Sequence, residues 1–303
     1  MKLFRLRLAA VIFGLIAVQI CAGAAGRKSV KSSALNTIAR DPYVGALVLE
    51  AASGKVLFED HADAKAYPAS LVKLMDLLLV LEKVERRELS FRDPVPVSAR
   101  AAAAAPSKVY LEPGESFSVD EMLYALMLRS ANDAAVALAE MVAGSTDAFV
   151  ELMNRRAHEL GMNATEFHSV NGLPPARGQA RDVTNARDLS LLCREALKHA
   201  DTLRFTSTRE RTFRPNAGKK AVAMSNHNHL LRTVPGCDGL KTGYIYQAGF
   251  SIAVSVSRNG HRLIAIVLGS PDSKTRDHKA TELVSKGFAA LGLAPAGPSA
   301  KRR

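Results

Sequence analysis

Residues 70–84 read SLVKLMDLLLVLEKV, and this stretch decides the predicted fold. Its apolar side chains lie on nearly every face of a helix, which is typical of a helix buried in a protein core. Ser70 and Lys73 are one helical turn apart, so a hydroxyl and an amine share one face at the start of this helix. The stretch therefore predicts a core helix that carries two reactive groups.

The chemistry of this pair depends on where the lysine lies. A serine at a helix N-terminus is placed where developing negative charge is favoured, and a lysine of lowered pKa can take its proton. The spacing alone is a weak signal, because a helix cap followed by a solvated lysine has the same pattern. Lys73, however, interrupts an apolar run in which a solvated face is hard to find. We therefore interpret Ser70 and Lys73 as a candidate nucleophile and base.

Strand patterns lie on both sides of a helical block. Residues 43–58 predict a hairpin with a turn at Ser53-Gly54, and a second hairpin turns at Asn259-Gly260. A capping box at Ser118 to Glu121 starts the block. Its helices are predicted over residues 118–128, 133–142, 146–160 and 182–199, and a closing helix over 275–291. The pattern predicts an α+β fold, an antiparallel sheet flanked by helices with an inserted all-helical subdomain.

Length and composition set the domain organisation. The chain has 303 residues, 48% hydrophobic and 23% charged, which indicates a globular protein whose core needs no disulfide or metal. Its first 24 residues combine basic residues, an apolar stretch of 13 residues and small residues before the end, typical of a cleaved signal peptide. That stretch is short for a membrane anchor, which is the alternative. We predict a signal peptide (1–24), a flexible leader (25–40), one folded domain (41–292) and a basic tail (293–303).

The net charge of +12 suggests a polyanionic partner. A nucleic-acid partner is disfavoured, because export is predicted and the chain has no Trp and few other aromatic residues. A cell wall fits better. Cys193 and Cys237 follow the signal peptide, and a disulfide between them is allowed but not indicated. We expect no metal and no organic cofactor, because no Cys/His cluster has zinc spacing and no phosphate-binding glycine loop occurs.

Two further motifs follow the serine and lysine pair. Ser130-Ala-Asn132 lies at a junction of two predicted helices, from which a hydroxyl and an amide can point into a cleft. Lys241-Thr242-Gly243 precedes the alternating strands, so an ammonium and a hydroxyl are expected at the sheet edge. The glycine would let another segment approach the strand closely.

The order Ser-x-x-Lys, Ser-x-Asn, Lys-Thr-Gly resembles the three signature motifs of the penicillin-recognising serine enzymes. Across about residues 40–290 the chain is similar to the low-molecular-mass penicillin-binding proteins, the serine-type D-alanyl-D-alanine carboxypeptidases. Their second-motif helix pair is matched by LYALMLRSANDAAVALAE, residues 123–140, and their third motif by DGLKTGY, residues 238–244. The resemblance implies a β-lactamase/transpeptidase-like fold for the domain at 41–292.

The resemblance also implies a role for each motif residue. Ser70 would attack the D-alanyl-D-alanine carbonyl, with Lys73 as general base, its pKa lowered by partial burial and by the nearby Lys241. Ser130 would relay the proton to the leaving amine, and Asn132 would bind the substrate amide and fix Lys73. The backbone N–H groups of Ser70 and Tyr244 would form the oxyanion hole. The substrate-binding residues would be Lys241, Thr242, Gly243 and Arg276, of which Lys241 and Thr242, helped by Arg276, would hold the terminal carboxylate.

The implied function is that of an exported periplasmic or cell-wall peptidase. It would cleave peptidoglycan stem peptides through an acyl-enzyme, and β-lactams would acylate the same serine. Many members of the family carry a further domain and a C-terminal membrane helix. Since the sequence ends about ten residues after the last predicted helix, we expect no stable membrane anchor, and cleavage of cross-links as an endopeptidase is an alternative.

Two alternatives concern other classes. A class A β-lactamase needs an acid that activates the deacylating water, and Glu166 is the candidate, although the spacing around it differs from that family. An inactive wall-binding homologue would need a lost motif residue, and none is lost. Tyr244 replaces a residue that is often histidine in the family, which predicts a difference in specificity.

Overall fold

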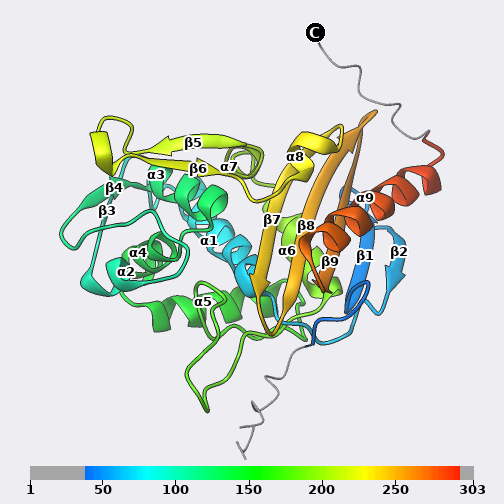
Figure 1. Cartoon of the computed structure of the whole chain (residues 1–303), viewed down its shortest axis with the longest axis horizontal. Coiled ribbons are helices and arrows are strands. Elements are labelled where there is room, and N and C mark those ends of the chain that lie inside the picture. The colour runs from blue at the N-terminus through cyan, green and yellow to red at the C-terminus, as the bar shows by residue number, and fades with distance from the viewer. Residues whose placement is uncertain (1–37, 294–303) are drawn as a thin grey trace, which may run out of the picture. The chain divides into compact units, whose positions relative to one another are not determined.

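The computed structural model describes residues 38–293, and strands from both ends of that range form one antiparallel sheet (Figure 1). The strand order is β2-β1-β9-β8-β7. The strands are β1 (Gly45–Glu50), β2 (Val56–Asp60), β7 (Cys237–Ile245), β8 (Gly249–Arg258) and β9 (His261–Ser270). The predicted α+β architecture is confirmed, and β7, which carries the Lys-Thr-Gly motif, is an edge strand.

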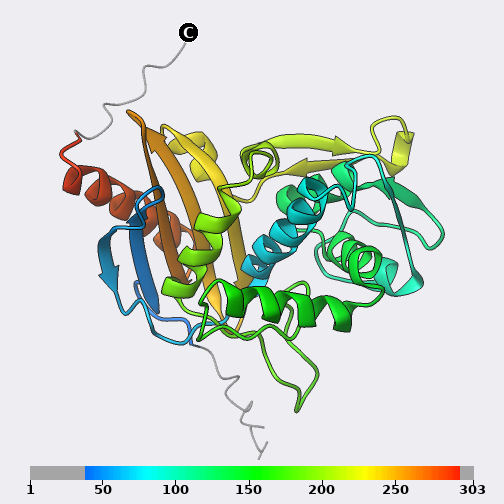
Figure 2. The same cartoon turned by 180° about the vertical axis from the view of Figure 1, so that it is seen from behind.

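Both faces of the sheet are covered, which explains why its strands read as apolar runs. Along β1, Val48 belongs to the cluster that packs against α9 (Ser273–Ala290), whereas Leu47 belongs to the larger core on the opposite face. Helix α6 (Ala186–Ala196) lies on that opposite face (Figure 2). Because alternate side chains of a strand point to opposite faces, a sheet buried on both faces needs apolar residues at both sets of positions.

The helical block lies beside the strand β7 edge of the sheet (Figure 1). The predicted core helix is confirmed as α1 (Lys73–Glu85), and its first nine residues are buried. Its first predicted turn is a separate 3-10 helix, η1 (Ala69–Val72). The other helices are α2 (Ala99–Ala103), α3 (Val119–Tyr124), the π-helix η2 (Ala125–Arg129), α4 (Asn132–Ala143), α5 (Thr146–Glu159), α7 (Thr202–Thr206), the 3-10 helix η3 (Gly218–Lys220) and α8 (Leu230–Thr233).

The inserted region differs from the prediction in being only partly helical. It also contains two two-stranded sheets, formed by β3 (Pro94–Pro96) with β4 (Ser116–Ser118) and by β5 (Glu210–Phe213) with β6 (Val222–Ser225). Strands this short, one with prolines at both ends, give too few residues for an alternating pattern to be recognised.

The helix expected over residues 182–199 begins later, at Ala186. The Asn185 side chain accepts a hydrogen bond from the Asp188 N–H and caps it. The preceding residues instead form isolated bridges, Val183 with Glu166 and Thr184 with Ala66. The first bridge ties the loop before α6 to the loop after α5, and the second ties it to the segment that leads into η1.

The predicted signal peptide, most of the leader and nearly all of the basic tail lie outside the described residues. Contacts begin before residue 41, since the Ile38 N–H donates to the Gln247 carbonyl at 2.9 Å and the Arg40 N–H to the Gly269 carbonyl at 3.0 Å. Within residues 38–293, no helix is both long enough and apolar enough to cross a membrane.

Candidate active site

Ser70 lies on the short helix η1, which packs closely against strand β7. A Cβ atom at Gly243 would lie 2.8 Å from the Pro68 carbonyl oxygen and 3.2 Å from the Ser70 nitrogen. No larger residue fits there without moving the turn that carries the serine. The segment that Gly243 lets approach is thus η1 of the same chain.

The Lys73 amine contacts the other residues expected around the serine. Its Nζ lies 3.2 Å from Ser70 Oγ, 2.8 Å from Asn132 Oδ1 and 2.9 Å from the Asn171 carbonyl oxygen. The Asn132 amide nitrogen donates to the Ala105 carbonyl, which fixes its oxygen toward Lys73. Two of the three partners can only accept, whereas a hydroxyl can also donate. A Lys73 ammonium can donate one N–H to each of the three. After loss of a proton, two N–H groups still serve the carbonyls and the lone pair faces the Ser70 hydroxyl, so the same partners hold the neutral amine.

Burial favours the neutral form of the Lys73 amine. The Lys73 side chain is fully buried, and this desolvation lowers the pKa of Lys73 to about 8. The carboxyls of Asp76, Asp182 and Asp133 raise the pKa again in part. Lys73 was expected to be partly buried and is completely buried. The expected effect of Lys241 on the pKa of Lys73 is not among its causes; instead, the charge of Lys73 lowers the pKa of Lys241.

Ser130 is held in a sparsely populated backbone conformation. It follows the π-helix η2 and has φ 57° and ψ 36°, in the left-handed region. Its Oγ accepts a hydrogen bond from Lys241 Nζ at 3.0 Å, and Lys241 also donates to the Thr242 carbonyl at 2.9 Å. Strained backbone of this kind gathers at functional sites. The second and third motifs therefore meet here, although 111 residues separate Ser130 from Lys241.

Lys241 is also nearly completely buried. This desolvation, together with the charges of Lys73 and Arg276, lowers its pKa well below the usual range. An anion in the cleft would reverse part of the effect, because a nearby negative charge favours the ammonium form.

The two lysines lie beside an open cleft of about 400 Å³. Its walls include Ser70, Ser130, Thr242, Gly243, Tyr244 and Arg276. Arg276, on α9, is 4% exposed, and its Nε donates to Asp277 Oδ1 at 2.8 Å. The Tyr244 ring is half exposed and stacks on Phe250 with ring centroids 4.2 Å apart. All three motifs and Arg276 therefore contribute to one cleft.

Sequence reasoning missed two histidines of the cleft, His227 and His229. Desolvation in the cleft and the charges of Lys241 and Arg129 lower the pKa of His227 to about 4, although its side chain reaches solvent. The alternating Asn-His-Asn-His pattern was the available signal. Asn226 and Asn228 are buried and hydrogen-bond to the backbone, whereas His227 and His229, which alternate with them, are exposed and line the cleft.

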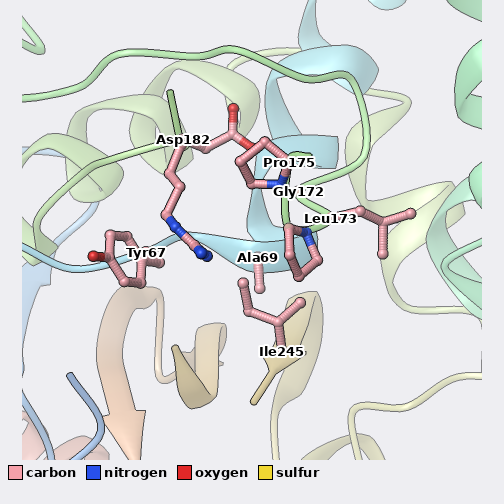
Figure 3. A pocket seen from close by; sticks show the side chains of 9 residues that line it. Tyr67, Ala69, Gly172, Leu173, Pro175, Asp182 and Ile245 are labelled. Carbon is pink, nitrogen blue, oxygen red and sulfur yellow. The ribbon is translucent and has the colours of Figure 1, made fainter. Parts of the chain in front are cut away.

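A small cavity of about 10 Å³ is lined by Ala69, the residue before Ser70 in the chain (Figure 3). Figure 3 shows Ala69 between Tyr67 and the Gly172-Leu173 segment, with Asp182 above them. The Asp182 carboxylate accepts hydrogen bonds from the His168 and Ser169 N–H groups and from the Ser169 hydroxyl. It thereby holds the loop that supplies the Asn171 carbonyl to Lys73.

Glu166, the candidate acid of a β-lactamase, does not line this cleft. Its side chain is 64% exposed and pairs with His168 Nε2 at 3.1 Å, and it borders a separate hollow with Asn154 and His158. The acid needed for that alternative is thus absent from the described walls of the cleft.

Other expectations concern cysteines and metals. Cys193 and Cys237 are both free thiols. Within the described part of the chain, Glu82, Glu195 and His199 are close enough to share a metal ion. The Arg156 guanidinium pairs with both carboxylates, at 2.8 and 3.0 Å, and supplies the positive charge there.

The chain resembles known proteins over most of its length. The model of the D-alanyl-D-alanine carboxypeptidase family matches residues 32–272. The chain is 35% identical to DacF of Bacillus subtilis (strain 168), over 80% of this chain and 61% of that protein, and 35% identical to DacC of Escherichia coli (strain K12), over 80% and 60%. It therefore spans about 60% of the length of these curated relatives.

Solved structures agree with this. Penicillin-binding protein D2 from Listeria monocytogenes, in its ampicillin-bound form, is 32% identical with a TM-score of 0.72, over 82% of this chain and 98% of that one. DacD from Francisella tularensis is 27% identical with a TM-score of 0.75, over 80% and 70%. The fold, the three converging motifs and the family match agree, and the chain belongs to the D-alanyl-D-alanine carboxypeptidase family.

Proposed function

We propose that this chain is a serine peptidase that cleaves the D-alanyl-D-alanine end of peptidoglycan stem peptides through an acyl-enzyme on Ser70. One observation carries the proposal: Lys73 Nζ lies 3.2 Å from Ser70 Oγ while its other two partners are carbonyl oxygens. Once Lys73 has lost a proton, its two N–H groups satisfy the carbonyls and its lone pair is left for the serine proton.

In the acylation step, Ser70 Oγ attacks the carbonyl carbon and its proton passes to Lys73 Nζ. The carbonyl oxygen becomes an oxyanion, for which the N–H groups of Ser70 and Tyr244 are the proposed donors, each worth about 3–4 kcal/mol in acyl transfer. The C–N bond then breaks, and Ser130 passes a proton to the departing D-alanine amine. Ser130 takes up in turn the proton that Lys73 received from Ser70, which returns Lys73 to its neutral form for the attack of water. The hydrogen bond that Lys241 Nζ donates to Ser130 Oγ supports this relay, because it holds the hydroxyl beside the cleft while Lys241 stays an ammonium.

The substrate carboxylate is proposed to bind Lys241, Thr242 and Arg276, with Gly243 keeping strand β7 close to Ser70. Arg276 and Thr242 both line the cleft with Ser70. An arriving carboxylate raises the pKa of Lys241, so that this lysine binds it as an ammonium. Asn132 then serves two groups, the substrate amide and Lys73. Water releases the acyl group and restores Ser70.

The same serine is the proposed target of β-lactams, in line with a relative solved in an ampicillin-bound form. We also propose that the protein is exported and acts in the cell wall, with a signal peptide over residues 1–24 and the catalytic domain over residues 41–292. The basic net charge of +12 suits a wall rich in carboxylates.

Digestion of purified muropeptides, followed by mass spectrometry, tests the substrate. A carboxypeptidase converts pentapeptides to tetrapeptides with loss of one D-alanine and leaves cross-linked dimers intact. Collapse of dimers to monomers would instead identify an endopeptidase, and unchanged muropeptides would contradict both. The Ser70→Ala variant is the control for contaminating activity.

A further inference from the structure

Asp76 is a buried carboxyl that the proposed mechanism does not use. It lies on α1 one turn beyond Lys73, and its exposed fraction is 1%, against 0% for Lys73. Neither of its carboxyl oxygens hydrogen-bonds to another described residue of the protein. Buried polar groups are normally hydrogen-bonded, so a carboxyl of this kind calls for an explanation.

Two other buried carboxyls near Lys73 show the contrast. Asp133 accepts hydrogen bonds from the N–H groups of Val109, Leu111 and Ala134, and Asp182 holds the loop that contains Ser169. Each has a structural role in these bonds. Asp76 has none, and an unpartnered buried carboxyl lowers stability. A carboxylate at Asp76 would act on Lys73, one helical turn away, through its charge.

We propose that Asp76 is a positioning residue that acts through Lys73: its buried carboxylate stabilises the ammonium that Lys73 becomes on taking the Ser70 proton, and so sets the lower pH limit of acylation. This inference rests on the proposed function. No proton moves to or from Asp76 in the step, because the Ser70 proton passes to Lys73 and from there through Ser130 to the leaving amine.

The charges around Lys73 come from four elements. Asp76 lies on its own helix, Asp133 on α4, Asp182 in the loop before α6, and Lys241 on β7. Among the three carboxyls, Asp76 raises the pKa of Lys73 the most. Burial raises the pKa of Asp76 well above its usual range, the Lys73 ammonium lowers it in part, and the charge of Asp182 raises it further. The Lys73 ammonium and the Asp76 carboxylate therefore favour each other. Because both side chains are buried, dissolved salt screens their interaction only weakly.

The test compares Asp76→Asn with the wild type. The amide has nearly the same shape without the charge, so the rate of acylation by a fluorescent penicillin is measured for both between pH 5 and pH 10. Loss of the nearby negative charge lowers the pKa of Lys73. The acidic limb of the pH–rate profile, over which the acylation rate rises with pH, is therefore expected to move to lower pH by about one unit. The weaker base should also lower the alkaline plateau by roughly threefold. The control is Glu82→Gln, which removes a carboxylate of the same helix that pairs with Arg156, away from Lys73.

The outcomes separate the inference from the proposed function. An acidic limb shifted in Asp76→Asn but not in Glu82→Gln supports the role of Asp76. A wild type that is acylated while its limb coincides with that of Asp76→Asn overturns this inference alone. A wild type that is never acylated overturns the proposed function. A purely structural role would change the melting temperature and leave the acidic limb in place.

Discussion

Lys73 and Lys241 are two buried amines, and their partners determine what each can do. Lys73 meets Ser70, Asn132 and the Asn171 carbonyl, whereas Lys241 meets Ser130 and the Thr242 carbonyl. Burial disfavours the charged form of both. A site with two amines that lose protons readily is suited to move protons at moderate pH, which exposed lysines do not do.

The pKa of about 8 for Lys73 predicts the pH dependence of acylation. The base is active when deprotonated, so the rate should fall about tenfold per pH unit below about pH 8 and level off above it. Stopped-flow measurements of the penicillin acylation rate from below to above pH 8 test this pH dependence.

Replacement of the base gives a second check at this residue. Lys73→Met should lose acylation by orders of magnitude and keep its circular dichroism spectrum, because it replaces a buried amine with an apolar chain of similar length. Acylation near the wild-type rate would show that Lys73 is not the base.

At the level of elements, the site depends on η1 lying against β7. Gly243 permits this contact on one side, and on the other a Cβ at Gly172 would lie 2.0 Å from the Ala69 carbonyl oxygen. The turn that bears Ser70 is thus held between two glycines from different segments. The position of the nucleophile relative to the β7 backbone follows from this packing.

Gly243→Ala is expected to push η1 away from β7 and lower the acylation rate by at least tenfold, since small displacements in a catalytic site are costly. Gly260→Ala is the matched control, because Gly260 lies in the β8–β9 turn with no atom near the added methyl group. Its positive φ of 80° predicts a lower melting temperature with an unchanged rate. Equal rates in all three proteins would contradict the role given to Gly243.

At the level of the whole molecule, the sequence was informative where motifs are made of side chains. The order of the motifs at Ser70, Ser130 and Lys241 predicted that distant segments meet. In the structure each motif contributes to the walls of one cleft, and Lys241 donates a hydrogen bond to Ser130. The α+β fold was predicted from apolar residues that repeat every two residues in the strands and about every 3.6 residues in the helices. The Asn171 carbonyl could not be predicted, because a backbone acceptor leaves no mark in the sequence.

Other features depend on tertiary packing and were missed for that reason. The left-handed Ser130 after a π-helix has no turn residue to announce it. The strands β3 to β6 are too short for a periodic signal. Asp76 reads as one polar residue in an apolar helix, and only its burial without a hydrogen bond draws attention to it.

Intact-mass spectrometry after incubation with penicillin tests the central claim, that Ser70 is the acylated nucleophile, most directly. The wild type should gain the mass of one penicillin, proteolysis should place it on the peptide that contains Ser70, and Ser70→Ala should gain nothing. No adduct on the wild type, or an adduct that persists in Ser70→Ala, would contradict the account.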